Sequence, residues 1–181
     1  MIGDVVLRDH TGRVRQAAVE ALVSYDTIAG DNVQAERLDA VPSSRYPIVL
    51  VYADDSAVGG APAGTAPYFD VTCHMIVQVL VQHAQLGDAV DALDTLIEQV
   101  KDGLFGDPNW VRLTENISSF RVTRSFKDGD RITGDGRILI EMTWRERYPP
   151  RITQPLRKID VTVAPSGGAP TLQVEIDLLA T

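Results

Sequence analysis

An alternation of apolar and polar residues from Tyr68 to Ala84 is the sequence feature that most constrains the fold. Every second residue is apolar, and most of the intervening residues are polar. This alternation predicts a strand with one buried face and one mostly polar face. Strands usually have about 3–10 residues, so we expect this one to bend or to protrude beyond the sheet, where its backbone groups would invite pairing with another chain.

Two shorter strands are expected before the long one. Residues 32–38 are a half-polar candidate, and the apolar run from Pro47 to Ala53 predicts a strand that is covered on both faces. Residues 54–67 are rich in Gly, Ala and Pro and predict a long loop. Loops of this length are usually functional or disordered. We interpret this one either as a flexible hairpin connection or as an arm that orders against a neighbouring subunit.

A second alternating pattern lies later in the chain. Within Phe120–Phe126 the apolar residues all occupy even-numbered positions, and the same holds within Ile138–Trp144 apart from Leu139. Turn-forming residues lie between these runs, at 127–130 and at 134–136. The pattern therefore predicts an antiparallel hairpin with a loose tip.

Two segments have the helical spacing of apolar residues. Residues 11–25 carry an apolar stripe at intervals of three and four, and Thr11 is the expected N-cap. The clearest stripe runs over Asp88–Leu104, where Asp88 is expected to cap the first turn. The following Asp107–Asn109 segment contains proline and predicts a turn that stops further helix. Both helices are amphipathic, so we expect them to lie on a sheet.

These elements predict an α+β fold class. Strands outnumber helices and most connect as hairpins, so we expect a mixed, mostly antiparallel β-sheet with two α-helices packed on one face. Residues 1–153 are expected to form this domain. Residues 154–181 contain two short strand candidates, Ile159–Val163 and Leu172–Leu178, and are interpreted as a β-rich C-terminal arm or an appended hairpin.

Composition argues against several classes of protein. The 181 residues include 17 Lys and Arg and 25 Asp and Glu, a formal net charge of −8, whereas a generic nucleic-acid binder shows a basic footprint. One cysteine excludes an intrachain disulfide and a thiolate metal cage. No apolar run approaches the roughly 20 residues that cross a bilayer, and the first residues do not have the pattern of a signal peptide. We therefore expect no membrane partner.

Residue types that support catalysis are present, but their spacing does not indicate a site. His74 and His83 are expected on opposite faces of the long strand, and His10 lies far away in the sequence, whereas catalytic zinc needs three convergent ligands. Cys73 has the parity of the buried face and is interpreted as a core residue. The sequence contains no nucleophile elbow, phosphate-binding loop, dinucleotide fingerprint or zinc-protease motif. We predict no catalytic residue, no cofactor and no metal site.

Basic residues gather after Trp144. Arg145, Arg147 and Arg151, together with Tyr148, are candidates for a surface that docks an acidic partner, because charge complementarity steers and registers interfaces. The alternative interpretation is a solvated strand end.

The order of these features resembles the tail terminator proteins of tailed bacteriophages, which are also described as minor tail protein U-like or tail completion proteins. The resemblance covers about residues 1–150, and the chain departs from the family pattern beyond about residue 155. It is carried by Val14–Leu22, Ala29–Val33, Tyr46–Tyr52, the long alternating strand, Asp88–Gly106 and Gly136–Trp144.

The resemblance implies an assembly protein that is not an enzyme. Members of the family form a hexameric ring on the end of the tail tube, stop tube polymerisation and offer the other face of the ring to head-completion proteins. The implied partners are copies of this chain, the tail tube protein and the head-closure or connector protein. Viral DNA is expected to pass through the ring without sequence-specific binding, which an acidic protein favours because binding depends on neutralised phosphates. The implied location is the virion tail or neck, assembled in the bacterial cytoplasm.

Loop composition and strand parity suggest residues for the contact between subunits. These candidates are Asp54, Asp55, Val58, Pro62, Tyr68 and His83.

Two other functions stay open: another neck or tail component, such as a head-closure or tail-tube protein, and a small enzyme with a site around His74, Asp54 and Asp55. A tube subunit would stack without limit, whereas a terminator would close one ring. An enzyme would have a deep pocket with perturbed carboxylates or histidine.

Overall fold

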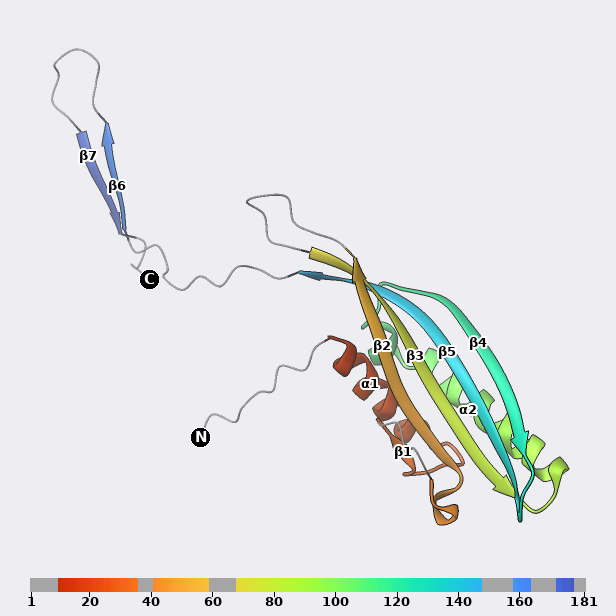
Figure 1. Ribbon diagram of the computed structural model, residues 1–181. Helices are drawn as coiled ribbons and strands as arrows, with labels where there is room; N and C mark the ends of the chain where they lie inside the picture. Colours follow the sequence, from red (N-terminus) through yellow and green to blue (C-terminus); the bar gives the residue numbers. More distant parts are fainter. Residues whose placement is uncertain (1–9, 36–40, 59–67, 148–157, 164–171, 178–181) are drawn as a thin grey trace. The chain divides into compact units, whose positions relative to one another are not determined.

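The structure, a computed structural model, divides the chain into two units, 1–147 and 148–181 (Figure 1). The described residues are 10–35, 41–58, 68–147, 158–163 and 172–177. The boundary expected between residues 153 and 154 lies outside them, so that division stays a prediction.

A five-stranded sheet with the order β1-β2-β3-β5-β4 forms the first unit. β1 pairs in parallel with β2, and every other pairing in this sheet is antiparallel. The sheet is therefore mixed and mostly antiparallel, as expected. Its strands are β1 (Val33–Gln34), β2 (Ile48–Val58), β3 (Tyr68–His83), β4 (Asn116–Lys127) and β5 (Ile132–Arg147).

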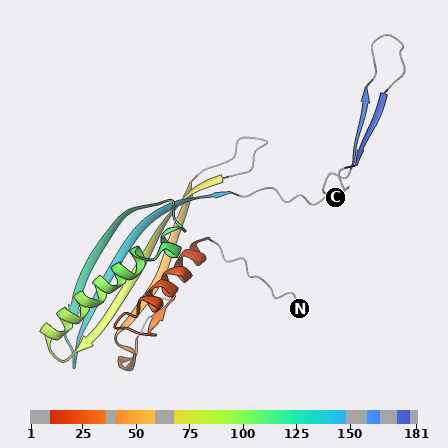
Figure 2. The same ribbon diagram turned by 180° about the vertical axis from the view of Figure 1, so that it is seen from behind.

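Both long helices cover the same face of this sheet (Figures 1 and 2). α1 (His10–Tyr25) contacts β1 and β2, and α2 (Leu86–Phe105) contacts β3 and β5. Two short elements complete the unit, the 3-10 turn η1 (Ser43–Arg45) before β2 and the helix α3 (Pro108–Val111) after α2. The predicted α+β class, with two helices on one face of the sheet, is confirmed.

The alternation in β3 defines the core. Its odd-numbered residues from Val71 to Val81 are all buried beneath the helices. β3 is paired with β5 over its whole length and with β2 from Asp70 to Leu80. Of the two alternatives expected for this strand, a bend or a protrusion, the protrusion is wrong, because β5 along its whole length and β2 along eleven residues satisfy its backbone groups. The strand bends along its length instead (Figure 1).

The start of the predicted loop belongs to the sheet. Residues 54–58 extend β2, since each pairs with a residue of β3 in the range 70–74. The loop prediction is wrong for these five positions because cross-strand pairing outweighs their weak strand propensity. Residues 59–67 lie outside the described residues. Of the strand expected at 32–38, the structure contains Val33 and Gln34 as β1, and residues 36–40 also lie outside the described residues.

Gly134 and Gly136 were expected in a turn but lie inside β5, beneath α2. A Cβ atom at Gly136 would lie 2.7 Å from Cγ2 of Val79 and 2.9 Å from Cδ1 of Ile97. Glycine is needed here because a side chain would occupy the space that the buried residues of α2 and β3 fill. The hairpin itself turns between Lys127 and Ile132.

Three expected helix boundaries are wrong. Thr11 lies inside α1, and its hydroxyl donates to the carboxylate of Asp55 instead of capping the helix. Asp88 lies in the first turn of α2, whose N-cap position is occupied by Gln85 without a side-chain cap. Asp107 caps the short helix α3 and does not form a turn that stops helical structure. Proline after the cap is compatible with helix, since the first helical N–H has no intrahelical partner.

The second unit is an antiparallel hairpin of β6 (Lys158–Val163) and β7 (Leu172–Asp177). Both strands lie at the two strand candidates of the tail, Ile159–Val163 and Leu172–Leu178. Leu178, the last residue of the second candidate strand, lies outside the described residues.

Candidate functional site

The face of the sheet that the helices leave uncovered, here called the open face, carries two of the three residues considered for an enzyme site, Asp54 and His74. Asp54 of β2, His74 of β3 and Glu141 of β5 occupy one row across the strands. His74 Nε2 lies 3.5 Å from a carboxylate oxygen of Glu141, and both side chains are nearly half exposed. The hydroxyl of Ser118 donates to the other oxygen of Glu141 at 2.7 Å. This row forms an exposed polar network.

The third residue of the suggested enzyme site, Asp55, lies elsewhere, and so does Cys73, which was not part of that site. Asp55 lies on the opposite face of β2 from Asp54, and its carboxylate accepts a hydrogen bond from the hydroxyl of Thr11 in α1. The structure therefore does not gather Asp54, Asp55 and His74 into one site. Cys73 is fully buried, and burial raises the pKa of its thiol to about 12, with a smaller contribution from the nearby charges of Asp55 and Asp54. A thiol with such a high pKa is a poor nucleophile. The interpretation of Cys73 as a core residue is confirmed.

The histidines also lie apart. His10 packs against Trp144 with ring centroids 4.7 Å apart, and its Nε2 donates to the carbonyl oxygen of Leu113 at 2.6 Å. His74 lies on the open face, and His83 is at the far end of β3, opposite Ile132. In the described part of the chain no three His, Cys, Asp or Glu residues are grouped so that they could hold a metal ion.

Arg145, a candidate for docking an acidic partner, already has an acidic neighbour. Its Nε donates to Asp70 Oδ1 at 2.7 Å, and its guanidinium lies 5.1 Å from the ring centroid of Tyr68. The hydrogen bond and charge of Asp70 raise the pKa of Arg145. Arg147 is exposed at the end of β5, whereas Tyr148 and Arg151 lie outside the described residues. The positive charge of Arg145 is therefore already balanced by Asp70 of the same chain.

The candidates for the contact between subunits do not form one patch. Asp54 lies on the open face, and Asp55 faces α1. Val58 ends β2 and its backbone pairs with Asp70 of β3, whereas Tyr68 begins β3 and is exposed. His83 is at the opposite end of the sixteen-residue strand β3 from Tyr68. Pro62 lies outside the described residues.

The surface that sequence analysis missed is the free edge of the sheet along β4. This strand ends the strand order, and ten of its twelve residues are exposed. Two large apolar side chains, Phe120 and Phe126, are 51% and 39% exposed. Alternation within 116–127 predicts a strand, but only the order of strands in the folded sheet shows that it lies at an edge.

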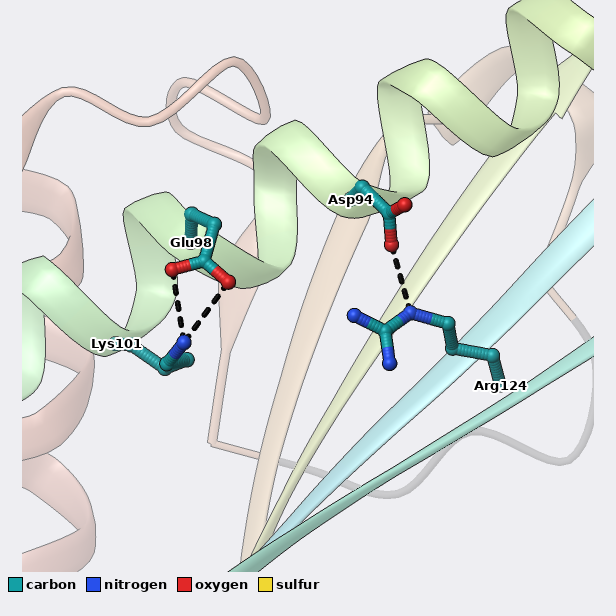
Figure 3. A network of polar contacts seen from close by, with 4 residues as sticks. All are labelled: Asp94, Glu98, Lys101 and Arg124. Atoms are coloured by element: carbon teal, nitrogen blue, oxygen red, sulfur yellow. Dashed lines mark hydrogen bonds and ion pairs between the residues drawn. The ribbon is translucent and has the colours of Figure 1, made fainter.

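Ion pairs of α2 lie along this edge (Figure 3). Arg124 Nε contacts Asp94 Oδ1 at 2.6 Å, which joins β4 to the helix. Lys101 contacts Glu98 at 2.8 Å and lies 5.9 Å from the ring centroid of Phe120. The ring of Phe120 also packs against Phe105, with centroids 5.5 Å apart. The helix-facing side of β4 is thus anchored to α2, while its outer edge carries no further strand among the described residues.

The described residues line open hollows, among them the following two. One of about 590 Å³ is lined near the hairpin tip by residues that include Gln82, Lys127 and Asp130. The other, of about 280 Å³, lies where Tyr25 of α1 meets Gly103 of α2. No helix in the described residues is long and apolar enough to cross a membrane.

Comparisons with known proteins complete the description of the chain. No protein-family model matches it, and no curated protein matches it. Among solved structures, a chain of "Virion of native gene transfer agent (GTA) particle" is similar with a TM-score of 0.34 and 15% sequence identity. The match covers 71% of this chain and 94% of that chain.

Proposed function

We propose that this chain is a structural virion protein that acts by binding copies of itself and neighbouring proteins, and that it catalyses no reaction. More specifically, we propose a tail terminator that forms a hexameric ring on the end of the tail tube. The ring would stop tube polymerisation and offer its other face to the head-completion proteins, with viral DNA passing through its centre. The α+β architecture with two helices on one face agrees with the resemblance to that family.

The observation that carries the proposal is the exposed edge of β4. On its outer side the twelve-residue strand β4 pairs with no other strand among the described residues, and the N–H and C=O groups of such an edge form a template for pairing with another chain. Large exposed apolar side chains beside such an edge are typical of an interaction site. A closed ring also needs two different surfaces on each subunit, and the first unit and the C-terminal hairpin supply two unlike surfaces.

The decisive experiment is a mass measurement and electron microscopy of the purified full chain, alone and with tail tubes from the same particle. We expect sixfold rings that appear at tube ends and stop further growth. Unlimited filaments of the chain alone would indicate a tail-tube subunit, and binding to connector rings but not to tubes would indicate a head-closure protein. Turnover of a small molecule that disappears with one polar substitution, such as His74→Ala, would overturn the structural role.

A further inference from the structure

The C-terminal hairpin has two unlike faces. Its register places Ile159 opposite Ile176, Val161 opposite Val174 and Val163 opposite Leu172. Because residues alternate between the faces of a strand, these six branched aliphatic residues share one face. The residues of the other face are Lys158, Asp160, Thr162, Gln173, Glu175 and Asp177. The hairpin is therefore an amphipathic ribbon.

Such a ribbon is poorly stabilised by itself. A two-stranded hairpin is at best marginally stable in water, because it has no second layer on which to bury an apolar face. Asp160 also lies directly opposite Glu175, and like charges in opposite positions destabilise a strand pair. A neighbouring strand with apolar residues on one face and a cation on the other would relieve both problems.

The edge strand β4 has that pattern. Phe120 and Val122 lie on its helix-covered face, where they pair with Ile140 and Ile138 of the core. Arg121 lies between them on the open face, and it is exposed. The strand contains three basic residues and no acidic one. Among the described residues, the ion pair of this strand is made by Arg124 and not by Arg121.

We propose that β7 of one copy pairs in antiparallel fashion along the β4 edge of a second copy, with Glu175 beside Arg121. In this register Ile176 lies beside Phe120 and Val174 beside Val122, so both apolar faces continue the layer beneath α2. A slip of one residue would move every apolar residue of the hairpin to the open face. The register is thus specified by charge and by apolar pattern together.

That the hairpin comes from a second copy rests on the proposed function. Ten residues, 148–157, separate Arg147 from the hairpin, and a chain of this length spans at most about 33–36 Å. Strands in a sheet lie about 4.8 Å apart, so a linker of this length is long enough for the hairpin to reach the sheet of a neighbouring copy. In a ring, each copy would donate one hairpin and receive one, which leaves no β4 edge open.

Disulfide trapping tests the pairing directly. The proposed register places Gln173 opposite Thr123, both on the polar face. Mixing full-length Thr123→Cys with full-length Gln173→Cys should give a linked dimer, with a yield at least about tenfold above a mixture of Ser24→Cys and Gln173→Cys. Ser24 is an exposed residue of α1 and serves as the matched control. The native Cys73 is fully buried and should not compete.

Two results would overturn the proposal. One is an equal yield of dimer from the Ser24 control. The other is a disulfide that forms only within single chains that carry both Thr123→Cys and Gln173→Cys, which would place the hairpin on its own sheet.

Charge reversal provides an independent test. Arg121→Glu and Glu175→Arg should each weaken self-association by about fivefold, the upper range for one exposed ion pair, and the combined variant should recover it. Arg13→Glu, the same change on an exposed residue of α1, should leave association unchanged. Rings that form equally well in all four variants would refute the docking but not the terminator function. Trans disulfides without rings at tube ends would refute the terminator function but not the docking.

Discussion

Substitution of Gly136 by alanine should destabilise the first unit, although alanine is the smallest possible addition. The new Cβ would lie 2.7 Å from Cγ2 of Val79 and 2.9 Å from Cδ1 of Ile97. Carbon atoms pack best at about 3.5–4.0 Å, and both neighbours are fully buried. The side chains of Val79 and Ile97 must therefore rotate, or α2 or β3 must move away from β5.

The expected cost follows from two opposing terms. Overpacking a filled core costs about 1–3 kcal/mol, while removing the backbone freedom of glycine returns about 0.5–1 kcal/mol. We expect Gly136→Ala to lower the free energy of unfolding by about 1–2 kcal/mol, measured by urea denaturation of the full chain. For a protein of this size the melting temperature should fall by about 2–8 °C.

The control is Gly87→Ala in the first turn of α2, where an added Cβ meets no atom within 4 Å. This change should raise stability by up to about 1 kcal/mol, since alanine has the higher helix propensity. Ile97→Val removes one of the crowding methyl groups, so Gly136→Ala should cost at least about 0.5 kcal/mol less in that background. A Gly136→Ala variant as stable as the wild type would refute the account of the contact between α2 and β5.

Three further changes probe other parts of the unit. Asp107→Ala removes the carboxylate that accepts from two backbone amides of α3 and should cost about 0.5–2 kcal/mol in urea denaturation, with Asp107→Ser close to wild type. Burial raises the pKa of the Cys73 thiol from its ordinary value to about 12, so stability should fall as pH rises from about 9 towards 12, and Cys73→Ala should make that fall smaller. The coupling between Asp94 and Arg124, from a double-mutant cycle in 0.1 M salt, should be about 0.2–1 kcal/mol and should shrink in 1 M salt; an unchanged coupling would contradict a solvent-exposed pair.

The elements that could be predicted from the sequence are those whose buried residues recur at a regular spacing along the chain. β3 and α2 each have one face in the core, and their periods of two and 3.6 residues show which face. The hairpin of β4 and β5 follows from the same pattern. The class of the fold was predictable because these local patterns agree with one another.

Features set by partners distant in sequence could not be predicted. Residues 54–58 have loop-like composition and become strand only because β3 lies beside them. Gly136 looks like a turn residue, and only the position of α2 above it explains why a side chain is excluded. Arg145 suggests a free cation until Asp70, from a different strand, is brought next to it. The exposure of the β4 edge likewise depends on the order of strands in the finished sheet.

The place of β3 between β2 and β5 has a consequence for biosynthesis. β2 and β3 can pair as soon as residue 83 has left the ribosome, but β5 is complete only at Arg147. At 5–20 residues per second, translation of residues 84–147 takes about 3–13 s. Throughout that interval the nascent chain has a sixteen-residue strand with one side unpaired. Chaperones that shield β strands during translation would act on this protein in that window, before its last central strand arrives.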